Sequence, residues 1–265
     1  GYLPKLHTSN DMDDIDELLV DFKKMVEELG SSETLKNDFA ANVSHELKTP
    51  LAAIQNYAQL LGTTELTPIQ QEYTDRILSS TQRLTSLIYN ILKLNKLESQ
   101  KIHPKPEPYD LCRQLSDCAI GFEAIWEQKK INFEADMEDR AVIEADEELM
   151  ELVWNNLLSN AFKFQKAGGM GSLKPFSDGE RIITEVGDTG CGMTPEMMKH
   201  MFDKFYQGDT SHSTEGNGLG LALVLRVLEM SGGTITVNST EGKGTVFTVS
   251  LPRAALAQKG ESQTS

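Results

Sequence analysis

Apolar residues recur at intervals of three and four along the first hundred residues, which is the spacing of one helix face. Over residues 15–29 these intervals form a heptad seam, typical of a coiled coil. A second amphipathic stretch covers residues 32–62, and a third begins at Pro68 with Thr67 as its cap. The pattern therefore predicts a coiled-coil helix followed by a hairpin of two long helices.

The pattern changes after a connector with prolines at positions 104, 106 and 108, which we expect to be stiff and extended. Downstream, short strand-like runs alternate with helical ones. The last two runs, 233–238 and 244–251, alternate apolar and polar residues, as in a β-hairpin closed by residues 241–243. Helices are expected at 111–128, 146–167 and 221–230. Residues 109–252 are thus predicted to form an α/β or α+β domain.

A hairpin of two amphipathic helices leaves one apolar side in water. A second copy of the chain covers that side and completes a four-helix bundle around a twofold axis. We therefore expect a homodimer through residues 33–98, with the coiled coil of residues 13–29 feeding into it.

Composition narrows the function classes. The 265 residues include 40 acidic and 25 basic ones, giving a formal net charge of −15. Phosphate backbones repel such a chain, which argues against nucleic-acid binding as its main activity. No apolar run reaches the ~18 residues of a membrane span. Three cysteines without a C-x-x-C pair argue against a disulfide framework or zinc knuckle and fit a reducing cytosol.

The first candidate for chemistry is His45, which the helical pattern places on an outer face. Glu46 can hold one ring nitrogen protonated and leave the other with a free lone pair, so the imidazole becomes a better nucleophile. Thr49 lies one turn further on the same side, where its hydroxyl can orient a water. The H-E-x-x-H zinc motif is excluded, because position 49 is threonine.

A second candidate lies in the helical run 155–164. Asn156, Asn160, Lys163 and Phe164 share one edge at helical spacing. Two amide oxygens, a cation and an aromatic ring suit a magnesium–triphosphate–purine ligand. A solvated helix face is the alternative explanation.

Two glycine-containing motifs follow. Asp188 ends an apolar run and can accept a hydrogen bond from an exocyclic amine, while Gly190 and Gly192 let the backbone approach a ligand. The segment 216–221 (Gly-Asn-Gly-Leu-Gly-Leu) opens a helix whose N–H groups suit phosphate, yet it matches neither the Rossmann nor the Walker pattern. The polar segment between them, with aromatic residues in 201–206, suits a mobile lid.

The fifth motif is Gly242-Lys243-Gly244-Thr245, for which an ordinary hairpin turn and a binding role both remain open. In their order and spacing these signals together resemble the H, N, G1, F, G2 and G3 boxes of sensor histidine kinases. Residues 13–29 resemble the second helix of a HAMP linker.

The resemblance implies a multidomain protein. An all-α antiparallel helical hairpin would form the dimeric four-helix bundle, followed by an α/β sandwich ATP-binding domain of the Bergerat (GHKL) type. The expected limits are 1–32 for the HAMP-like helix and coiled coil, 33–103 for the dimerisation and phosphotransfer domain, 104–253 for the catalytic domain and 254–265 for a polar tail.

The resemblance also implies roles and ligands. His45 is the expected phosphoacceptor, Glu46 its activating partner and Thr49 the threonine of a phosphatase activity. Asn160 and Asn156 are the expected Mg2+ ligands, and ATP is the nucleotide. The expected ATP-binding residues are Asn156, Asn160, Lys163, Phe164, Asp188, Gly190, Gly192, Lys204, Gly216, Gly218, Leu219, Gly220 and Thr245. The implied partners are a second copy and a response-regulator receiver domain, and the implied location is the cytoplasmic part of a membrane-anchored sensor.

One segment departs from the family pattern. Residues 167–175 have poor strand character, and Gly171 and Pro175 predict a short, edge-like or irregular strand.

Two other functions stay open. One is an ATPase or conformational switch of the same fold that does not phosphorylate itself, and the other is a coiled-coil scaffold with a degenerate nucleotide domain.

Overall fold

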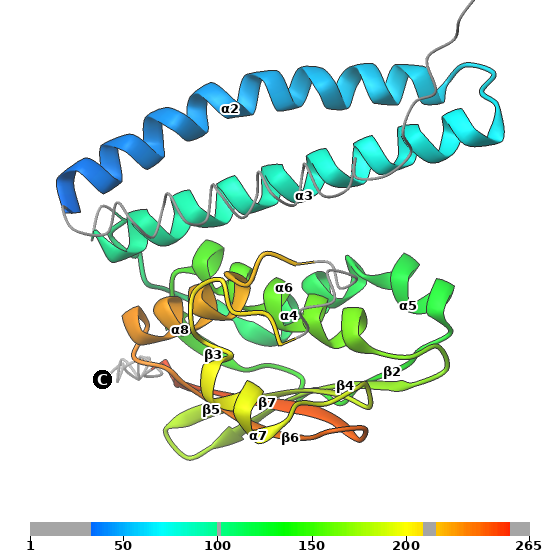
Figure 1. The fold of residues 1–265 in the computed structure, drawn as a ribbon. Coiled ribbons are helices and arrows are strands. Elements are labelled where there is room, and N and C mark those ends of the chain that lie inside the picture. Colours follow the sequence, from blue (N-terminus) through cyan, green and yellow to red (C-terminus); the bar gives the residue numbers. More distant parts are fainter. Residues whose placement is uncertain (1–32, 100–101, 209–215, 255–265) are drawn as a thin grey trace, which may run out of the picture. The chain divides into compact units, whose positions relative to one another are not determined.

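The computed structural model describes the chain over residues 33–99, 102–208 and 216–254, with side chains from residue 47 onward. These residues form two compact units that divide between residues 102 and 103, and residues 216–219 group with the first unit. Figure 1 shows the helices and strands of both units. The expected coiled coil and all but the first residue of the expected tail lie outside the described residues.

The first unit is a hairpin of two long helices, α2 (Glu33–Gly62) and α3 (Pro68–Glu98). The predicted start of α3 is confirmed: the Thr67 hydroxyl accepts from the backbone N–H of Gln70, and the Gln70 side chain accepts from the backbone N–H of Thr67. Helix α2 continues through Pro50. None of the described helices combines the length and apolar character needed to cross a bilayer.

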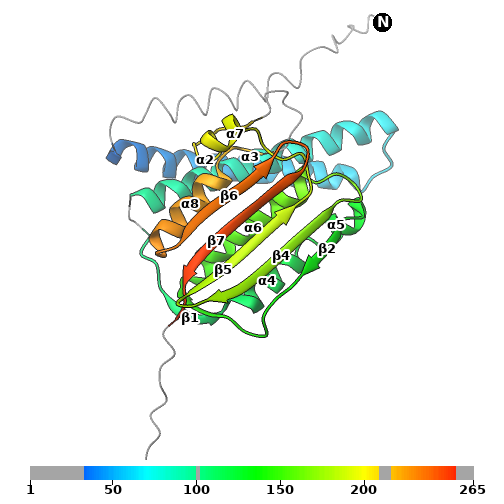
Figure 2. The ribbon, with the colours of Figure 1, turned by 90° about the horizontal axis from the view of Figure 1, so that it is seen from below.

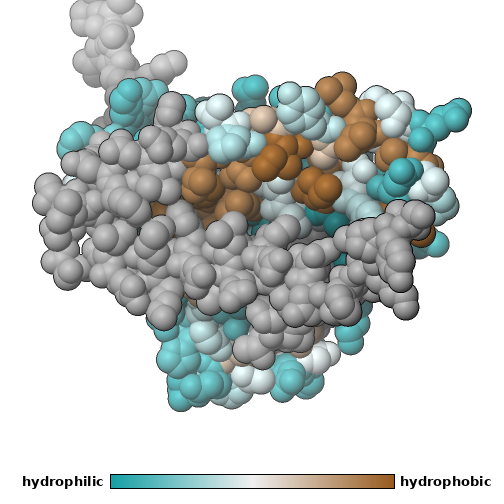
Figure 3. Space-filling view, turned by 45° about the horizontal axis from the view of Figure 1, so that its top comes forward, coloured by the Kyte–Doolittle hydropathy of each residue, from teal (hydrophilic) through white to brown (hydrophobic). Residues whose placement is uncertain are grey.

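Large apolar side chains remain exposed on the half of the hairpin next to its turn. Figure 3 shows hydrophobic residues gathered on this face. The exposed large aliphatic and aromatic side chains of this half of the hairpin are Ile54, Tyr57, Leu60, Leu61, Ile69, Tyr73 and Ile77. Exposed apolar side chains gathered on one face are typical of an interaction site.

The second unit is built on a five-stranded sheet. Its strands lie in the order β2 (Asn132–Ala135), β4 (Met170–Asp178), β5 (Arg181–Asp188), β7 (Gly244–Pro252) and β6 (Thr234–Thr240). Only β2 and β4 run parallel among these pairs. A separate antiparallel pair joins β1 (Glu107–Asp110) to β3 (Val142–Ala145).

Helices cover one face of this sheet. They are α4 (Leu111–Ile120), α6 (Glu147–Phe164) and α8 (Gly220–Met230), as Figures 1 and 2 show from two directions. Two shorter helices, α5 (Glu123–Lys129) and α7 (Pro195–His200), complete the described part of the unit. The α/β architecture predicted from the sequence is thus confirmed.

A buried polar network holds the start of α6 in place. The Gln114 side-chain oxygen accepts from Tyr109 Oη at 2.8 Å and from Trp154 Nε1 at 2.9 Å, and its amide donates to the Glu147 carbonyl at 2.7 Å. Asp146 caps α6 by accepting from Leu149 N. Because every named group has a partner, the network fixes α6 rather than weakening the core.

Two details of the sequence prediction were wrong. The helix expected at 111–128 is interrupted at Gly121 and Phe122, giving α4 and α5. Strand β4 is a regular nine-residue strand, not a short one. Strand β2 pairs with β4 only as far as Leu173, so β4 is an edge strand on that side beyond this residue. Pro175 lies in the unpaired part, where its missing N–H leaves no β2 acceptor without a donor.

Candidate functional site

Helix α6 carries most of the candidate side chains of the second unit. Its core face is buried, with Val153, Trp154, Leu157 and Leu158 fully enclosed. Asn156, Asn160 and Lys163 are half-buried along another edge, and Phe164 is 39% exposed at its end. The Lys163 ammonium lies over the Phe164 ring, 4.6 Å from the ring centre. Helical spacing therefore brings these four residues to one edge, as predicted.

The start of α8 lies against this edge. An ideal Cβ built on Gly220 would come within 2.4 Å of Asn156 Oδ1. The Asn156 amide donates to the Leu152 carbonyl at 2.7 Å, so its oxygen is the end that faces α8. A side chain at position 220 would therefore have to displace the Asn156 side chain.

Asp188 stands at the end of β5 and accepts from the backbone N–H of Gly190 at 2.8 Å. Burial raises the pKa of this carboxyl, and backbone hydrogen bonds from Gly190 and Thr245 oppose the rise. Strand pairing places Thr245 directly opposite Asp188. The fifth motif and Asp188 therefore belong to one site in space.

The turn after Asp188 is held on two sides. On one side, a Cβ on Gly190 would lie 2.4 Å from the Phe164 carbonyl oxygen, which also accepts from Cys191 N at 3.3 Å. On the other side, Gly192 has φ +64, and a Cβ there would overlap the Thr240 carbonyl of the β6–β7 hairpin. Gly192 therefore needs both the left-handed backbone and the missing side chain.

This edge of the second unit offers what a purine nucleotide needs. A half-buried carboxylate accepts hydrogen bonds, an exposed aromatic ring offers a stacking face, and an ammonium lies beside that ring. Among the described residues, no cluster of three or more His, Cys, Asp and Glu side chains could hold a metal ion. A magnesium ion here would thus rely on amide oxygens and the phosphates of its nucleotide, which is a usual arrangement for Mg2+.

Other predicted residues are not brought into this cluster. Lys204 is exposed in the turns after α7. Gly216, Gly218 and Leu219 group with the first unit; Gly218 has φ +65, and Leu219 is fully buried.

The phosphoacceptor candidates lie elsewhere in the chain. Thr49 is exposed on α2, and the side chains of His45 and Glu46, also in α2, lie outside the described ones.

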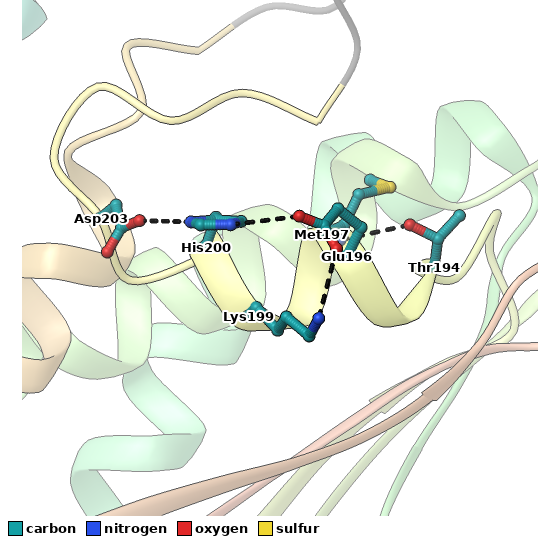
Figure 4. Close-up of polar contacts among 6 residues, drawn as sticks. All are labelled: Thr194, Glu196, Met197, Lys199, His200 and Asp203. Atoms are coloured by element: carbon teal, nitrogen blue, oxygen red, sulfur yellow. Dashed lines mark hydrogen bonds and ion pairs between the residues drawn. The ribbon is translucent and has the colours of Figure 1, made fainter.

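An exposed polar cluster marks helix α7 (Figure 4). His200 Nδ1 lies 2.7 Å from Asp203 Oδ2, and His200 Nε2 lies 3.3 Å from Glu196 Oε1. The hydrogen bond to Asp203 is the main cause that raises the pKa of His200. These pairs lie at the end of α7 and belong to no motif of the sequence.

Two residues of the Asp188 neighbourhood, Gln165 and Thr189, were not among the predicted site residues, and Gly244 was named only as part of the hairpin motif. Gln165 and Thr189 bond to each other through their side chains. Gly244 has φ +118, and a Cβ there would overlap the Asp188 carbonyl. Gly244 is recognisable from the sequence as a glycine in a hairpin motif. Gln165 is not, because a glutamine at a helix end has no pattern that indicates a site.

Comparison with known proteins gives the two units a family. Residues 35–100 match the model of the His Kinase A (phospho-acceptor) domain. Residues 145–255 match the model of the histidine kinase-, DNA gyrase B- and HSP90-like ATPase.

Individual proteins agree with these models. The circadian input-output histidine kinase CikA of Synechococcus elongatus is 34% identical over 85% of this chain and 31% of its own length. The aerobic respiration control sensor protein ArcB of Escherichia coli K12 is 32% identical over 84% of this chain and 29% of its own. The chain thus spans about a third of these relatives.

A solved structure adds the fold. Full-length ShkA in complex with AMPPNP matches with a TM-score of 0.69 and 31% identity, over 82% of this chain and 46% of that one. The match covers both the helical region and the sheet domain in one chain. Together with the two domain models, it shows that this chain belongs to the histidine kinase family.

Proposed function

We propose that this chain is the catalytic part of a sensor histidine kinase, which phosphorylates its own His45 with ATP. The observation that supports this most directly is the pairing, in one chain, of a phosphoacceptor-domain match and an ATPase-domain match with the Asp188 cluster in the second. Residues 33–103 would dimerise and accept the phosphoryl group, and residues 104–253 would hold ATP. Residues 1–32 would form the HAMP-like helix and coiled coil.

In the nucleotide site, Asp188 accepts a hydrogen bond from the adenine amine and Phe164 contacts the base. Lys163 and Lys204 offset phosphate charge, and the glycine motifs shape the pocket. Asn160, with Asn156 one turn before it, would hold Mg2+, which neutralises charge on the phosphates when bound. Gly216, Gly218, Leu219 and Gly220 would line the phosphate end, and Thr245 supports Asp188 through its backbone N–H.

In the phosphorylation step, an imidazole nitrogen of His45 attacks the γ-phosphorus. The new N–P bond forms as the bond to the β–γ bridging oxygen breaks, and ADP leaves with that electron pair. Glu46 holds the proton on the other ring nitrogen. Positioning and charge neutralisation account for most of the rate in such transfers.

The phosphoryl group then passes to an aspartate of a response-regulator receiver domain. We propose that Thr49, exposed one turn after His45, orients a water that hydrolyses the aspartyl phosphate of that partner, releasing inorganic phosphate and the free aspartate. The whole protein is proposed to be a membrane-anchored sensor with this part in the cytoplasm.

A homodimer is the proposed assembly. The exposed apolar side chains next to the hairpin turn support it, since a second hairpin would cover them (Figure 3). A concentration-dependent sedimentation profile tests this, and a monomer at all concentrations would contradict it.

Incubation with γ-labelled ATP tests the kinase activity. We expect an acid-labile, alkali-stable label on the protein that is lost in His45→Gln and in Asp188→Asn, while His103→Gln keeps it. Phosphate release without labelled protein would instead favour the ATPase or switch function. Absence of nucleotide binding would favour the scaffold.

A further inference from the structure

Gln165 is a buried polar residue that no part of the proposed site explains. It follows Phe164 directly, at the C-cap of α6, and is only 5% exposed. Its Nε2 lies 3.3 Å from Thr189 Oγ1, and its Oε1 has no partner. A buried polar atom without a partner is unfavourable, so a side chain that only filled this space would be better apolar.

The surroundings of Gln165 tie it to the Asp188 turn. Thr189 comes next after Asp188, and its hydroxyl also accepts from Met170 N at 2.9 Å. A Cβ on Gly169 would lie 2.6 Å from Gln165 Nε2 and 3.1 Å from Thr189 Oγ1, so the backbone closes over this contact. Either orientation of the amide makes the bond, because a hydroxyl both donates and accepts. The contact therefore joins the end of α6 to the Asp188 turn.

We propose that Gln165 is a positioning residue that sets the distance between the Phe164 ring and the Asp188 carboxylate, and thereby selects adenine over a purine without an exocyclic amine. The inference rests on the proposed role of Asp188 as acceptor for that amine. Gln165 itself touches no nucleotide: it acts through Thr189. The backbone N–H of Cys191 also donates to the Phe164 carbonyl at 3.3 Å, the same length as the Gln165–Thr189 contact, so these two contacts both join the helix end to the turn.

Selection follows from geometry. A hydrogen bond to a carboxylate weakens steeply when its distance or angle changes, whereas stacking on a ring tolerates small shifts. Loss of the Gln165–Thr189 contact should therefore lower the affinity for ATP more than the affinity for ITP. ATP uses both the ring and the carboxylate, whereas the base of ITP carries a carbonyl in place of the amine.

Gln165→Met tests the inference in the whole chain, because methionine keeps the length and volume and removes the amide. The matched control is Thr184→Val on β5, four residues before Asp188, which removes a buried hydroxyl that has no partner. For each variant, ATP and ITP affinities are measured by displacement of a fluorescent nucleotide, with the phosphorylation rate at saturating ATP and the melting temperature.

We expect Gln165→Met to lower the affinity for ATP by roughly fivefold to tenfold. ITP affinity and the rate at saturation should change by less than about twofold. Thr184→Val should bind both nucleotides like the parent. Thr189→Val should produce the same loss of preference, and the double variant no further loss of preference, because both substitutions remove the Gln165–Thr189 contact. Thr189→Val also removes the acceptor of Met170 N, which should lower its melting temperature.

An unchanged ratio of ATP to ITP affinity in Gln165→Met overturns the inference, as does an equal loss for both nucleotides. The variant Asp188→Asn shows whether the positioning role of Gln165 fails alone or together with the proposed amine-binding role of Asp188. If Asp188→Asn abolishes the preference and Gln165→Met does not, only the positioning role fails. If Asp188→Asn leaves the preference intact, the amine-binding role of Asp188 and the inference fail together.

Discussion

Gly190→Ala is the sharpest perturbation of the Asp188 turn. The backbone of Gly190 is not left-handed, so an alanine there meets only a problem of space. Its Cβ would lie 2.4 Å from the Phe164 carbonyl oxygen and 2.8 Å from Asp188 Oδ1. The first of these atoms is backbone and the second is fixed by its own hydrogen bond, so the turn has to move.

The size of the movement follows from ordinary contact distances. Carbon and oxygen atoms approach to about 3.3 Å, so the turn must shift by about 1 Å. Such a shift breaks the 2.8 Å bond from Gly190 N to Asp188 and the 3.3 Å bond from Cys191 N to Phe164. The displaced Asp188 then loses its proposed bond to the adenine amine; a hydrogen bond to a charged group contributes about 1.5–3 kcal/mol, which corresponds to at least a tenfold loss of ATP affinity.

The assay is a titration of ATP with the parent, Gly190→Ala and a control, Gly179→Asn. Gly179 lies at the far end of the β4–β5 pair, more than about 20 Å along the strands. It has φ +61 and open space around it, and asparagine tolerates that conformation. Parent-like ATP affinity in Gly190→Ala, with a normal melting curve, would refute the close packing of this turn on α6.

Three further predictions address other contacts. Gly220→Ala should push the Asn156 side chain away from the start of α8, lowering the free energy of unfolding by about 1–3 kcal/mol and reducing phosphorylation. Gly62→Ala is the control: nothing lies within 4 Å of its Cβ, so stability and phosphorylation should stay unchanged. Asp146→Ala removes the N-cap of α6 and should cost about 1–2 kcal/mol in urea denaturation, while Asp146→Asn recovers most of it. His200 has a raised pKa in the folded chain, so its stabilising contribution is fully present below its usual pKa near 6.5 and is lost as the pH rises through the raised value. The melting-temperature difference between the parent and His200→Gln should therefore shrink from pH 5.5 to pH 9, and a constant difference would contradict the pairing.

Local chemistry made much of the fold predictable. Two helix starts depend only on residues within three positions of each other: the capping box at Thr67 and Gln70, and the cap at Asp146. The local sequence is therefore sufficient to indicate them. The hairpin at residues 234–252 follows from alternation and a glycine turn. The alignment of Asn156, Asn160, Lys163 and Phe164 follows from helical periodicity alone.

Errors arose where distant partners decide the outcome. Gly171 and Pro175 disfavour a strand locally, yet β4 forms because β5 pairs with its whole length and β2 with its first part. The break at Gly121 between α4 and α5 goes against the long apolar repeat, which continues on both sides of it.

The amino-acid sequence by itself determined the order of the elements, the helix caps and the motifs that point to the kinase family, because these depend on neighbours along the chain. Only the tertiary structure decided which motifs meet. It placed Thr245 opposite Asp188, packed Gly220 on Asn156 and joined Gln165 to Thr189. These contacts join residues 24 to 64 positions apart in the chain, where no local propensity operates and only packing selects the partner.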